Sequence, residues 1–206
     1  MMELAGIAKP PSLPGRSLMP ATRGKSMAEE RRYLFSACDG GTSIFFHPTR
    51  GVRNARYKLI RNLQPGRENP DYGLYSSHFN EHFAGGTEIP EIEAAVPDVR
   101  KAYALWHHPP AYELYDLLKD PHEMHDLAED PGMRKVLNEL KKALADWQAD
   151  SRDPLADSAL LAEYIREMED VNTRYPKHAY NKDSSFRWKF PAKFREYVYA
   201  DRQAGK

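Results

Sequence analysis

The sequence predicts an α+β domain in which one long amphipathic helix covers a small antiparallel sheet of about four strands. Three observations lead to this prediction. Apolar residues recur at helical spacing between residues 130 and 147, a strand-like run occupies residues 112–117, and two short apolar runs flank a polar hinge at residues 53–56. The apolar face of the helix is therefore expected to pack on the sheet.

The strands are expected in four stretches of the first 117 residues. Tyr33–Ala37 is a short apolar run without clean alternation, as expected of a strand buried on both faces. Cys38–Thr42 contains two glycines and is expected to turn, and Ser43–Phe46 is expected to be extended. Thr49–Leu63 is predicted to be a β-hairpin. Tyr112–Leu117 is the last strand, and a proline that lacks a donor for the sheet follows it.

The long helix begins at a clear signal. Asp130 is the expected N-cap, and Pro131 stands at the first helical position, where its missing N–H costs nothing. The apolar positions that follow lie three and four residues apart and so share one face. They are Met133, Val136, Leu137, Leu140, Leu144 and Trp147.

The remaining segments carry weaker patterns. Residues 64–110 are expected to be irregular, except for one weak helix over Glu91–Trp106 that Pro97 interrupts. Ser158–Met168 is predicted to be a shorter amphipathic helix. Asn172–Lys206 is basic and aromatic with few aliphatic residues, so it is expected to wrap a surface.

Composition excludes several classes. The 206 residues suit one domain of ordinary size, and 30 basic residues balance 30 acidic ones. A net charge of zero gives no electrostatic case for nucleic acid or a membrane surface as a partner. The single cysteine permits no internal disulfide, no apolar run is long enough to span a bilayer, and the first residues do not form a signal peptide. The compartment therefore stays unknown.

Two ordered runs resemble a known family. ELYD at residues 113–116, KDPHE at 119–123, DLA at 126–128 and DWQ at 146–148 resemble the C-terminal region of sulfatases, closest to N-sulfoglucosamine sulfohydrolase-like (heparan N-sulfatase) members and to arylsulfatases. The family usually has Asn where this chain has Asp126. PTRGVR and RYKLI, within residues 48–60, form a second match in the right order.

The resemblance implies a domain organisation and a fold. Residues 1–30 would be a connector from an N-terminal catalytic domain, since Gly6 closes a helix-like turn and a Pro-rich run follows it. Residues 31–153 would be the sulfatase C-terminal α+β domain, of the alkaline-phosphatase-like superfamily. Residues 154–206 would add a helix and a wrapping tail. Full-length relatives are often periplasmic, secreted or lysosomal.

The resemblance also implies a reaction whose machinery this sequence lacks. Sulfatases hydrolyse a sulfate ester or a sulfamate with a formylglycine nucleophile, made from a C/S-x-P-x-R motif, and with calcium held by Asp and Asn. Cys38 is followed by Asp-Gly-Gly-Thr, which is no such motif. No catalytic or metal-ligating residue is therefore assigned here. The chain alone is expected to be inactive, and the N-terminal sulfatase domain is its implied partner.

The resemblance implies substrate contact from the loop between Cys38 and Arg53. In N-sulfatase-like members this loop returns to the mouth of the active site and often bears a His with an acidic neighbour. Asp39, His47 and Arg50 are the substrate-binding residues expected here. Gly40-Gly41 stands where a His is usual, so a simple turn with a surface His is the competing interpretation.

Other clusters favour structural roles. His122 and His125 are three apart in a turn, which does not match the zinc spacing of four on a helix, and His107-His108 is expected to be a loop pair. Cys38 is expected to be a buried small residue. Arg187 and Lys189 are expected to lie around a buried Trp rather than to bind a nucleic-acid base.

The basic residues from Arg50 to Arg61 leave two functions open. They are expected to form the solvated face of the hairpin, and the alternative is that they bind sulfated glycan. A stand-alone glycan-binding or assembly module is therefore a second hypothesis. A phosphohydrolase of the related alkaline-phosphatase group is a third.

Overall fold

A computed structural model describes residues 2–10, 16–25, 31–40, 42–76 and 87–190. The chain divides into two compact units, Met1–Arg32 and Tyr33–Lys206. The described part of the first unit holds the short helix α1 (Met19–Thr22) and a turn that ends at Gly6 in the left-handed region.

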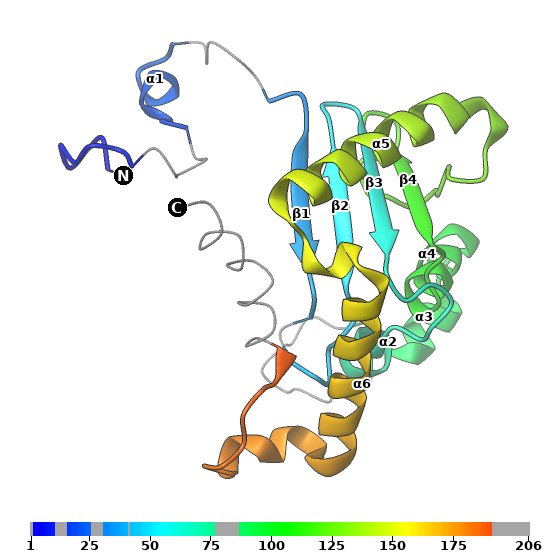
Figure 1. Cartoon of the computed structure of the whole chain (residues 1–206). Coiled ribbons are helices and arrows are strands. Elements are labelled where there is room, and N and C mark those ends of the chain that lie inside the picture. The colour runs from blue at the N-terminus through cyan, green and yellow to red at the C-terminus, as the bar shows by residue number, and fades with distance from the viewer. Residues whose placement is uncertain (1, 11–15, 26–30, 41, 77–86, 191–206) are drawn as a thin grey trace. The chain divides into compact units, whose positions relative to one another are not determined.

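Four antiparallel strands form one sheet in the order β1-β2-β3-β4 (Figure 1). They are β1 (Leu34–Cys38), β2 (Thr49–Arg53), β3 (Tyr57–Asn62) and β4 (Tyr112–Asp116). The β2–β3 hairpin turns at Asn54, whose side-chain oxygen accepts hydrogen bonds from the backbone N–H groups of Arg56 and Tyr57 at 2.8 and 2.7 Å. The predicted α+β fold with about four strands is confirmed.

Helix α5 (Arg134–Ser151) crosses one face of this sheet, as Figure 1 shows. Asp130 caps the 3-10 helix Pro131–Met133 before it by accepting a hydrogen bond from the Gly132 N–H at 2.8 Å. The core between helix and sheet consists of Val52, Leu59, Leu114, Leu140 and Leu144. Full burial of each such side chain contributes roughly 1.5–3 kcal/mol. The predicted packing of the helix on the sheet is confirmed.

Strand β1 differs from its prediction as a strand buried on both faces. Within the described residues it pairs with β2 alone, so it lies at the edge of the sheet, and the Leu34 side chain is 52% exposed. Phe35 faces α5, where its ring stacks on Trp147 with centroids 5.2 Å apart. Cys38 is exposed rather than buried because it ends this edge strand.

The connection from β1 to β2 also differs from its prediction. Residues 42–45 form a turn where an extended segment over residues 43–46 was predicted, and the Phe45 N–H donates to the Thr42 carbonyl at 3.2 Å. Gly40 allows this reversal. It has φ of +73°, and a Cβ atom there would lie 1.7 Å from the Phe45 carbonyl oxygen. Only glycine fits this backbone approach.

The remaining helices lie at the ends of the sheet. They are α2 (Pro70–Ser76), α3 (Ile89–Ala94), α4 (Pro97–His107), α6 (Ser158–Arg174) and the 3-10 helices Pro154–Ala156 and Pro176–Lys182. The single helix predicted over Glu91–Trp106 is instead two, because Pro97 begins the second, and α2 was not predicted. None of the helices in the described part of the chain is long and apolar enough to cross a membrane.

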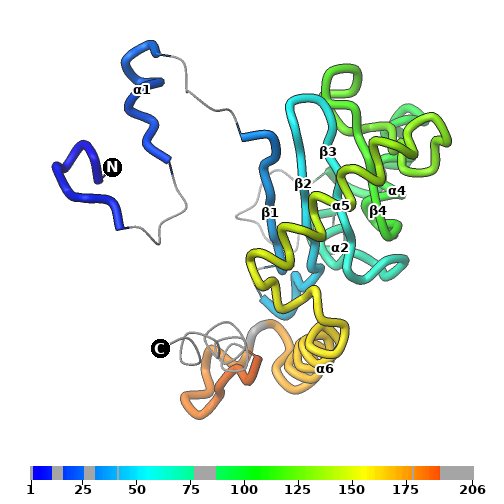
Figure 2. The backbone as a smooth tube through the Cα atoms, turned by 45° about the horizontal axis from the view of Figure 1, so that its top comes forward, coloured from blue at the N-terminus to red at the C-terminus, as the bar shows by residue number. Residues whose placement is uncertain are grey.

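Helix α6 continues six residues beyond its predicted end at Met168. Figure 2 shows it beyond the end of the sheet at which β1 stops and β2 starts. The following segment returns along α6, where Phe190 stacks on Tyr164 with ring centroids 3.8 Å apart. The described part of this segment therefore covers part of α6. Residues 191–206 lie outside the described residues.

Candidate functional site

The candidate site lies at the end of the sheet where β1 stops and β2 starts, and Arg50 is at its centre. Its side chain is 3% exposed. The guanidinium donates from Nε and Nη2 to the two carboxylate oxygens of Asp153, at 2.7 and 2.9 Å. Nη1 donates to Asp39 Oδ1 at 2.6 Å and to the Thr49 carbonyl at 2.9 Å. The structure thus brings Asp39 and Arg50 together and adds Asp153.

Asp153 holds the turn between α5 and α6 against the sheet. Its carboxylate also accepts hydrogen bonds from Gln148 Nε2 at 2.7 Å and from the Leu155 N–H at 3.2 Å. Gln148 in turn accepts from Arg61 Nη1 at 2.9 Å. The sequence alone assigned no role to Asp153. The signal was available, because Asp153-Pro154 repeats the capping pattern of Asp130-Pro131.

The ionisation states in this network follow from its contacts. Burial alone would lower the pKa of Arg50, but the hydrogen bonds that its guanidinium donates to Asp153 and Asp39 outweigh it and raise that pKa. Burial would likewise raise the pKa of Asp153, but the hydrogen bonds from Arg50 and Gln148 bring it below the ordinary value. The charges of Arg50 and Asp153 therefore persist at neutral pH. The side chain that the network presents outward is Asp39, which is 38% exposed.

Only part of the basic hairpin is the solvated face that its sequence predicts. Arg50 is buried, Arg53 is exposed and its Nε donates to the Asn54 carbonyl at 3.4 Å, and the other three cations each meet a side-chain partner. Arg56 pairs with Asp116 at 2.7 Å, Lys58 with Glu123 at 2.6 Å, and Arg61 with Gln148. Arg53 is therefore the hairpin cation that has no carboxylate or side-chain amide partner among the described residues and could meet a sulfated glycan. The charges of Arg50, Arg56 and Lys58 are paired with carboxylates.

His47 lies just before β2 and is only 6% exposed, so the interpretation as a surface His is wrong. Among the described residues neither ring nitrogen makes a hydrogen bond of normal geometry, although the Asn62 side chain interacts with the ring. Burial lowers the pKa of His47, the positive charge of Arg67 lowers it further, and the Asn62 side chain opposes this. The ring is consequently neutral near pH 7. It can accept at one nitrogen and donate at the other.

Further buried polar atoms without a partner among the described residues lie in neighbouring segments of the chain. They are Ser43 Oγ, Gln64 Nε2 and Asp71 Oδ1. A buried polar group left without a partner costs about 1–3 kcal/mol. Such groups are therefore expected to meet a ligand, water or another protein surface.

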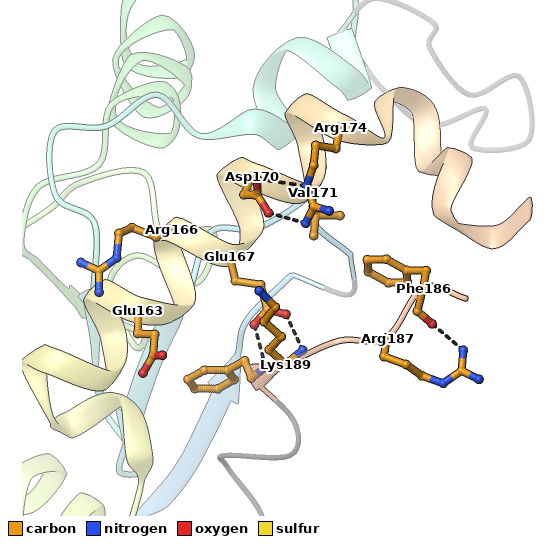
Figure 3. A pocket seen from close by; sticks show the side chains of 10 residues that line it. Glu163, Arg166, Glu167, Asp170, Val171, Arg174, Phe186, Arg187 and Lys189 are labelled. Atoms are coloured by element: carbon orange, nitrogen blue, oxygen red, sulfur yellow. Dashed lines mark hydrogen bonds and ion pairs between the residues drawn. The ribbon is translucent and has the colours of Figure 1, made fainter. Parts of the chain in front are cut away.

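A cavity of about 250 Å³ lies between α6 and residues 186–190 (Figure 3). Several of its charged groups are already used within the chain. Glu167 accepts the backbone N–H groups of Lys189 and Phe190 at 2.5 and 2.7 Å, and Arg174 pairs with Asp170. The side chains that line this cavity therefore do not form a surface of a single charge sign that could recognise a charged ligand.

The histidine clusters have local roles. His125 lies 3.6 Å from the Asp120 carboxylate and 3.7 Å from that of Asp98, and His107 stacks on Tyr72 with ring centroids 3.9 Å apart. Trp188 is half-buried, and Arg187 donates to backbone carbonyls nearby. Within the described ranges, no three His, Cys, Asp or Glu side chains are placed to share a metal ion.

Comparisons with known proteins agree on one region of one family. Residues 87–150 match the model described as "N-sulphoglucosamine sulphohydrolase, C-terminal". The chain is 30% identical over 145 residues to N-sulphoglucosamine sulphohydrolase from Homo sapiens, covering 69% of this chain and 27% of that protein. It is 29% identical over 163 residues to an ulvan-active sulfatase from Formosa agariphila, covering 77% and 29%.

A solved structure of a 2-O GAG sulfatase aligns with a TM-score of 0.48 and 27% identity, covering 74% of this chain and 23% of that one. The chain thus spans less than a third of the length of the curated relatives it matches.

Proposed function

Because this chain is homologous to the C-terminal region of sulfatases, we propose that it serves as the C-terminal part of a sulfuric ester or sulfamate hydrolase of the N-sulfoglucosamine sulfohydrolase or arylsulfatase kind. In such enzymes calcium and a formylglycine supply the cation and the nucleophile. The described residues fit neither group, since Cys38 lacks the motif and no acidic cluster can hold a metal ion. An N-terminal sulfatase domain is therefore the proposed partner.

The observation that carries this proposal is the polar end of the sheet. Asp39 stands there as an exposed carboxylate on a buried, fully engaged cation, while His47 keeps two ring nitrogens without a hydrogen bond of normal geometry among the described residues. A fold that acted alone would compensate the desolvation of the His47 nitrogens only through the Asn62 side chain. A catalytic domain or a substrate that packs here would supply the hydrogen bonds.

The three expected substrate-binding residues take different roles in this proposal. Asp39 accepts a hydrogen bond from a hydroxyl or an amine of the sugar, since a carboxylate repels the sulfate itself. Arg50 is a positioning residue, because its donors are engaged by Asp39, Asp153 and a backbone carbonyl. His47 pairs as a neutral ring with the substrate or the partner domain.

The decisive experiment is to sequence the transcript upstream of the Met1 codon and to express the whole open frame with a formylglycine-generating enzyme. We expect the whole protein to release sulfate from 4-nitrophenyl sulfate and from an N-sulfated glucosamine, and the 206-residue chain alone to release none. Calcium-dependent hydrolysis by the chain alone, abolished by alanine substitution of its own acids, would contradict the proposal.

Asp39→Ala tests the role in substrate recognition. In the whole protein, it is expected to lower kcat/KM for the sulfated sugar by about tenfold or more, with 4-nitrophenyl sulfate changed less than about twofold. Asp150→Ala is the matched control, because Asp150 is an exposed acid on α5. Equal losses on both substrates would instead indicate a purely structural role for Asp39.

A stop codon and a genuine start site directly upstream of Met1 would favour the second hypothesis, a separate glycan-binding module. Its test is retention on a heparin matrix that decreases as salt increases. The pairing of Arg56 and Lys58 with carboxylates argues against strong retention.

A further inference from the structure

The sheet ends in an edge strand on each side, and the chain covers one of these edges. Strand β4 is the covered edge. The Leu114 N–H donates to Asp126 Oδ1 at 2.8 Å, and the Leu114 carbonyl accepts from the Leu127 N–H at 2.8 Å. The outward-facing backbone groups in the middle of β4 are therefore used within the chain, and Glu113 and Asp116 add charge to this strand.

Strand β1 is the open edge of the sheet (Figure 1). Within the described residues its backbone groups bond to β2 alone, and four of its five residues are exposed. Its sequence, LFSAC, holds no charged residue and no proline. Charged residues and prolines are the usual means by which proteins keep an edge strand from pairing with another strand. The unpaired N–H and C=O groups of β1 therefore suit another extended backbone.

The charges on either side of β1 favour a second copy of the same strand, in antiparallel orientation. Arg31 and Arg32 precede the strand, and Asp39 follows it. Antiparallel pairing of two copies brings the basic end of each strand to the acidic end of the other, whereas parallel pairing sets like charges side by side. Asp39 is available for this contact, because its carboxylate is 38% exposed and only one oxygen accepts from Arg50.

One register of this pairing also matches the side chains by size. When Ser36 stands opposite its own copy, Phe35 lies opposite Ala37, and Leu34 lies opposite Cys38. Each large apolar side chain then meets a small one across the strands. Charge and size are thus self-complementary along β1, as the interface of a two-fold dimer requires.

We propose that the edge of β1 is a self-association surface, at which two copies of this chain pair antiparallel about a two-fold axis through Ser36. The two four-stranded sheets then form one continuous sheet. A pair of five-residue strands makes a contact near the small end of specific interfaces, so we expect a dissociation constant of about 10–100 µM. This inference does not rest on the proposed function.

Sedimentation equilibrium of the 206-residue chain, at concentrations from about 1 to 500 µM that bracket this constant, is the first test. We expect a single monomer–dimer equilibrium. Ser36→Lys sets two cations opposite each other at the axis and is expected to weaken association by at least about tenfold, because like charges directly opposite repel. Ser184→Lys is the matched control, since Ser184 is an exposed serine outside the sheet, and it should change association less than about twofold.

Disulfide cross-linking tests the register. Residues directly opposite in an antiparallel pair have Cα atoms about 4.5–5.5 Å apart, a separation that a disulfide spans. Ser36→Cys in a Cys38→Ser background is therefore expected to give a covalent dimer under mild oxidation. Leu34→Cys should do the same when Cys38 is kept and should fail to do so in the Cys38→Ser background. The unaltered chain should cross-link more slowly, because Cys38 stands opposite Leu34.

The proposal is overturned if the folded chain stays monomeric over this concentration range. It is also overturned if Ser36→Lys and Ser184→Lys associate equally, or if the unaltered chain cross-links faster than Ser36→Cys in the Cys38→Ser background. If Ser36→Lys unfolds, the cross-linking comparison still decides, since the cysteine variants add no charge. None of these results bears on sulfate release by the whole protein, so the proposed function stands or falls separately.

Discussion

The two halves of this sheet bury their side chains in opposite ways. Under α5, leucines and a valine fill the space between helix and sheet. At the end near Asp39, a charged network and a neutral histidine are buried instead, and the histidine makes no hydrogen bond of normal geometry among the described residues. The chain itself supplies the contacts that the apolar side chains of the first half need. The second half points to a surface or a ligand outside it.

The largest expected effect comes from breaking the charged network. Asp153→Ala leaves the Arg50 guanidinium buried with one carboxylate instead of two, and we expect it to lower the free energy of unfolding by about 3–5 kcal/mol. Chemical denaturation measures this, with Asp150→Ala as the exposed control. The double variant Arg50→Met, Asp153→Leu should regain most of the loss. If it does not, the network stabilises the fold beyond simple charge pairing.

The core provides the comparison for that result. Leu144→Ala removes buried methyl groups between α5 and the sheet and is expected to cost about 2–5 kcal/mol in the same denaturation experiment. Leu118→Ala, at an exposed position, should change stability by less than about 0.5 kcal/mol. Equal effects at the two positions would mean that α5 does not pack as described.

Alanine substitutions at two glycines can distinguish the cost of a strained backbone from the cost of a steric clash. Gly40 and Gly66 have nearly the same φ, +73° and +72°, but only at Gly40 would a Cβ atom meet another residue. Gly66→Ala is expected to cost about 1–2 kcal/mol, the price of the left-handed conformation. Gly40→Ala should cost at least about 1 kcal/mol more, because the Phe45 carbonyl must move. Equal thermal-denaturation shifts would show that the turn adapts freely.

The smallest effect is a dependence of stability on pH. Because the pKa of His47 is lowered in the folded state, the unfolded chain takes up a proton first as the pH falls below about 6.5. The contribution of His47 is therefore fully present above pH 6.5 and declines below it, by at most about 1.4 kcal/mol per pH unit. Comparing urea midpoints of wild type and His47→Phe at pH 7.5 and 5.5 should reveal the difference. Parallel changes in both proteins would exclude His47 as the cause.

Local patterns account for the parts of the fold that the sequence revealed. Asp130-Pro131 marks the start of the long helix, and the period of its leucines identifies the buried face, because both signals lie within a few residues. Whether a strand is internal or at an edge depends on distant partners. For that reason β1 was predicted as buried, although Leu34 is half-exposed.

The candidate site shows the same limit more strongly. Asp39 and Arg50 stand near each other in sequence, and their association could be anticipated from the family resemblance. Asp153 reaches Arg50 across 103 residues, which no local pattern encodes. The burial of His47 likewise depends on how the segments around it pack, so a short motif could not distinguish it from a surface side chain.

The end position of Cys38 on the edge strand has a practical consequence. It is the only cysteine in the sequence, its thiol is exposed, and it adjoins Asp39. A maleimide dye would therefore attach at one known point beside the candidate site, without any engineered substitution. A change in the emission or anisotropy of that dye would report directly on the arrival of a catalytic domain at this end of the sheet.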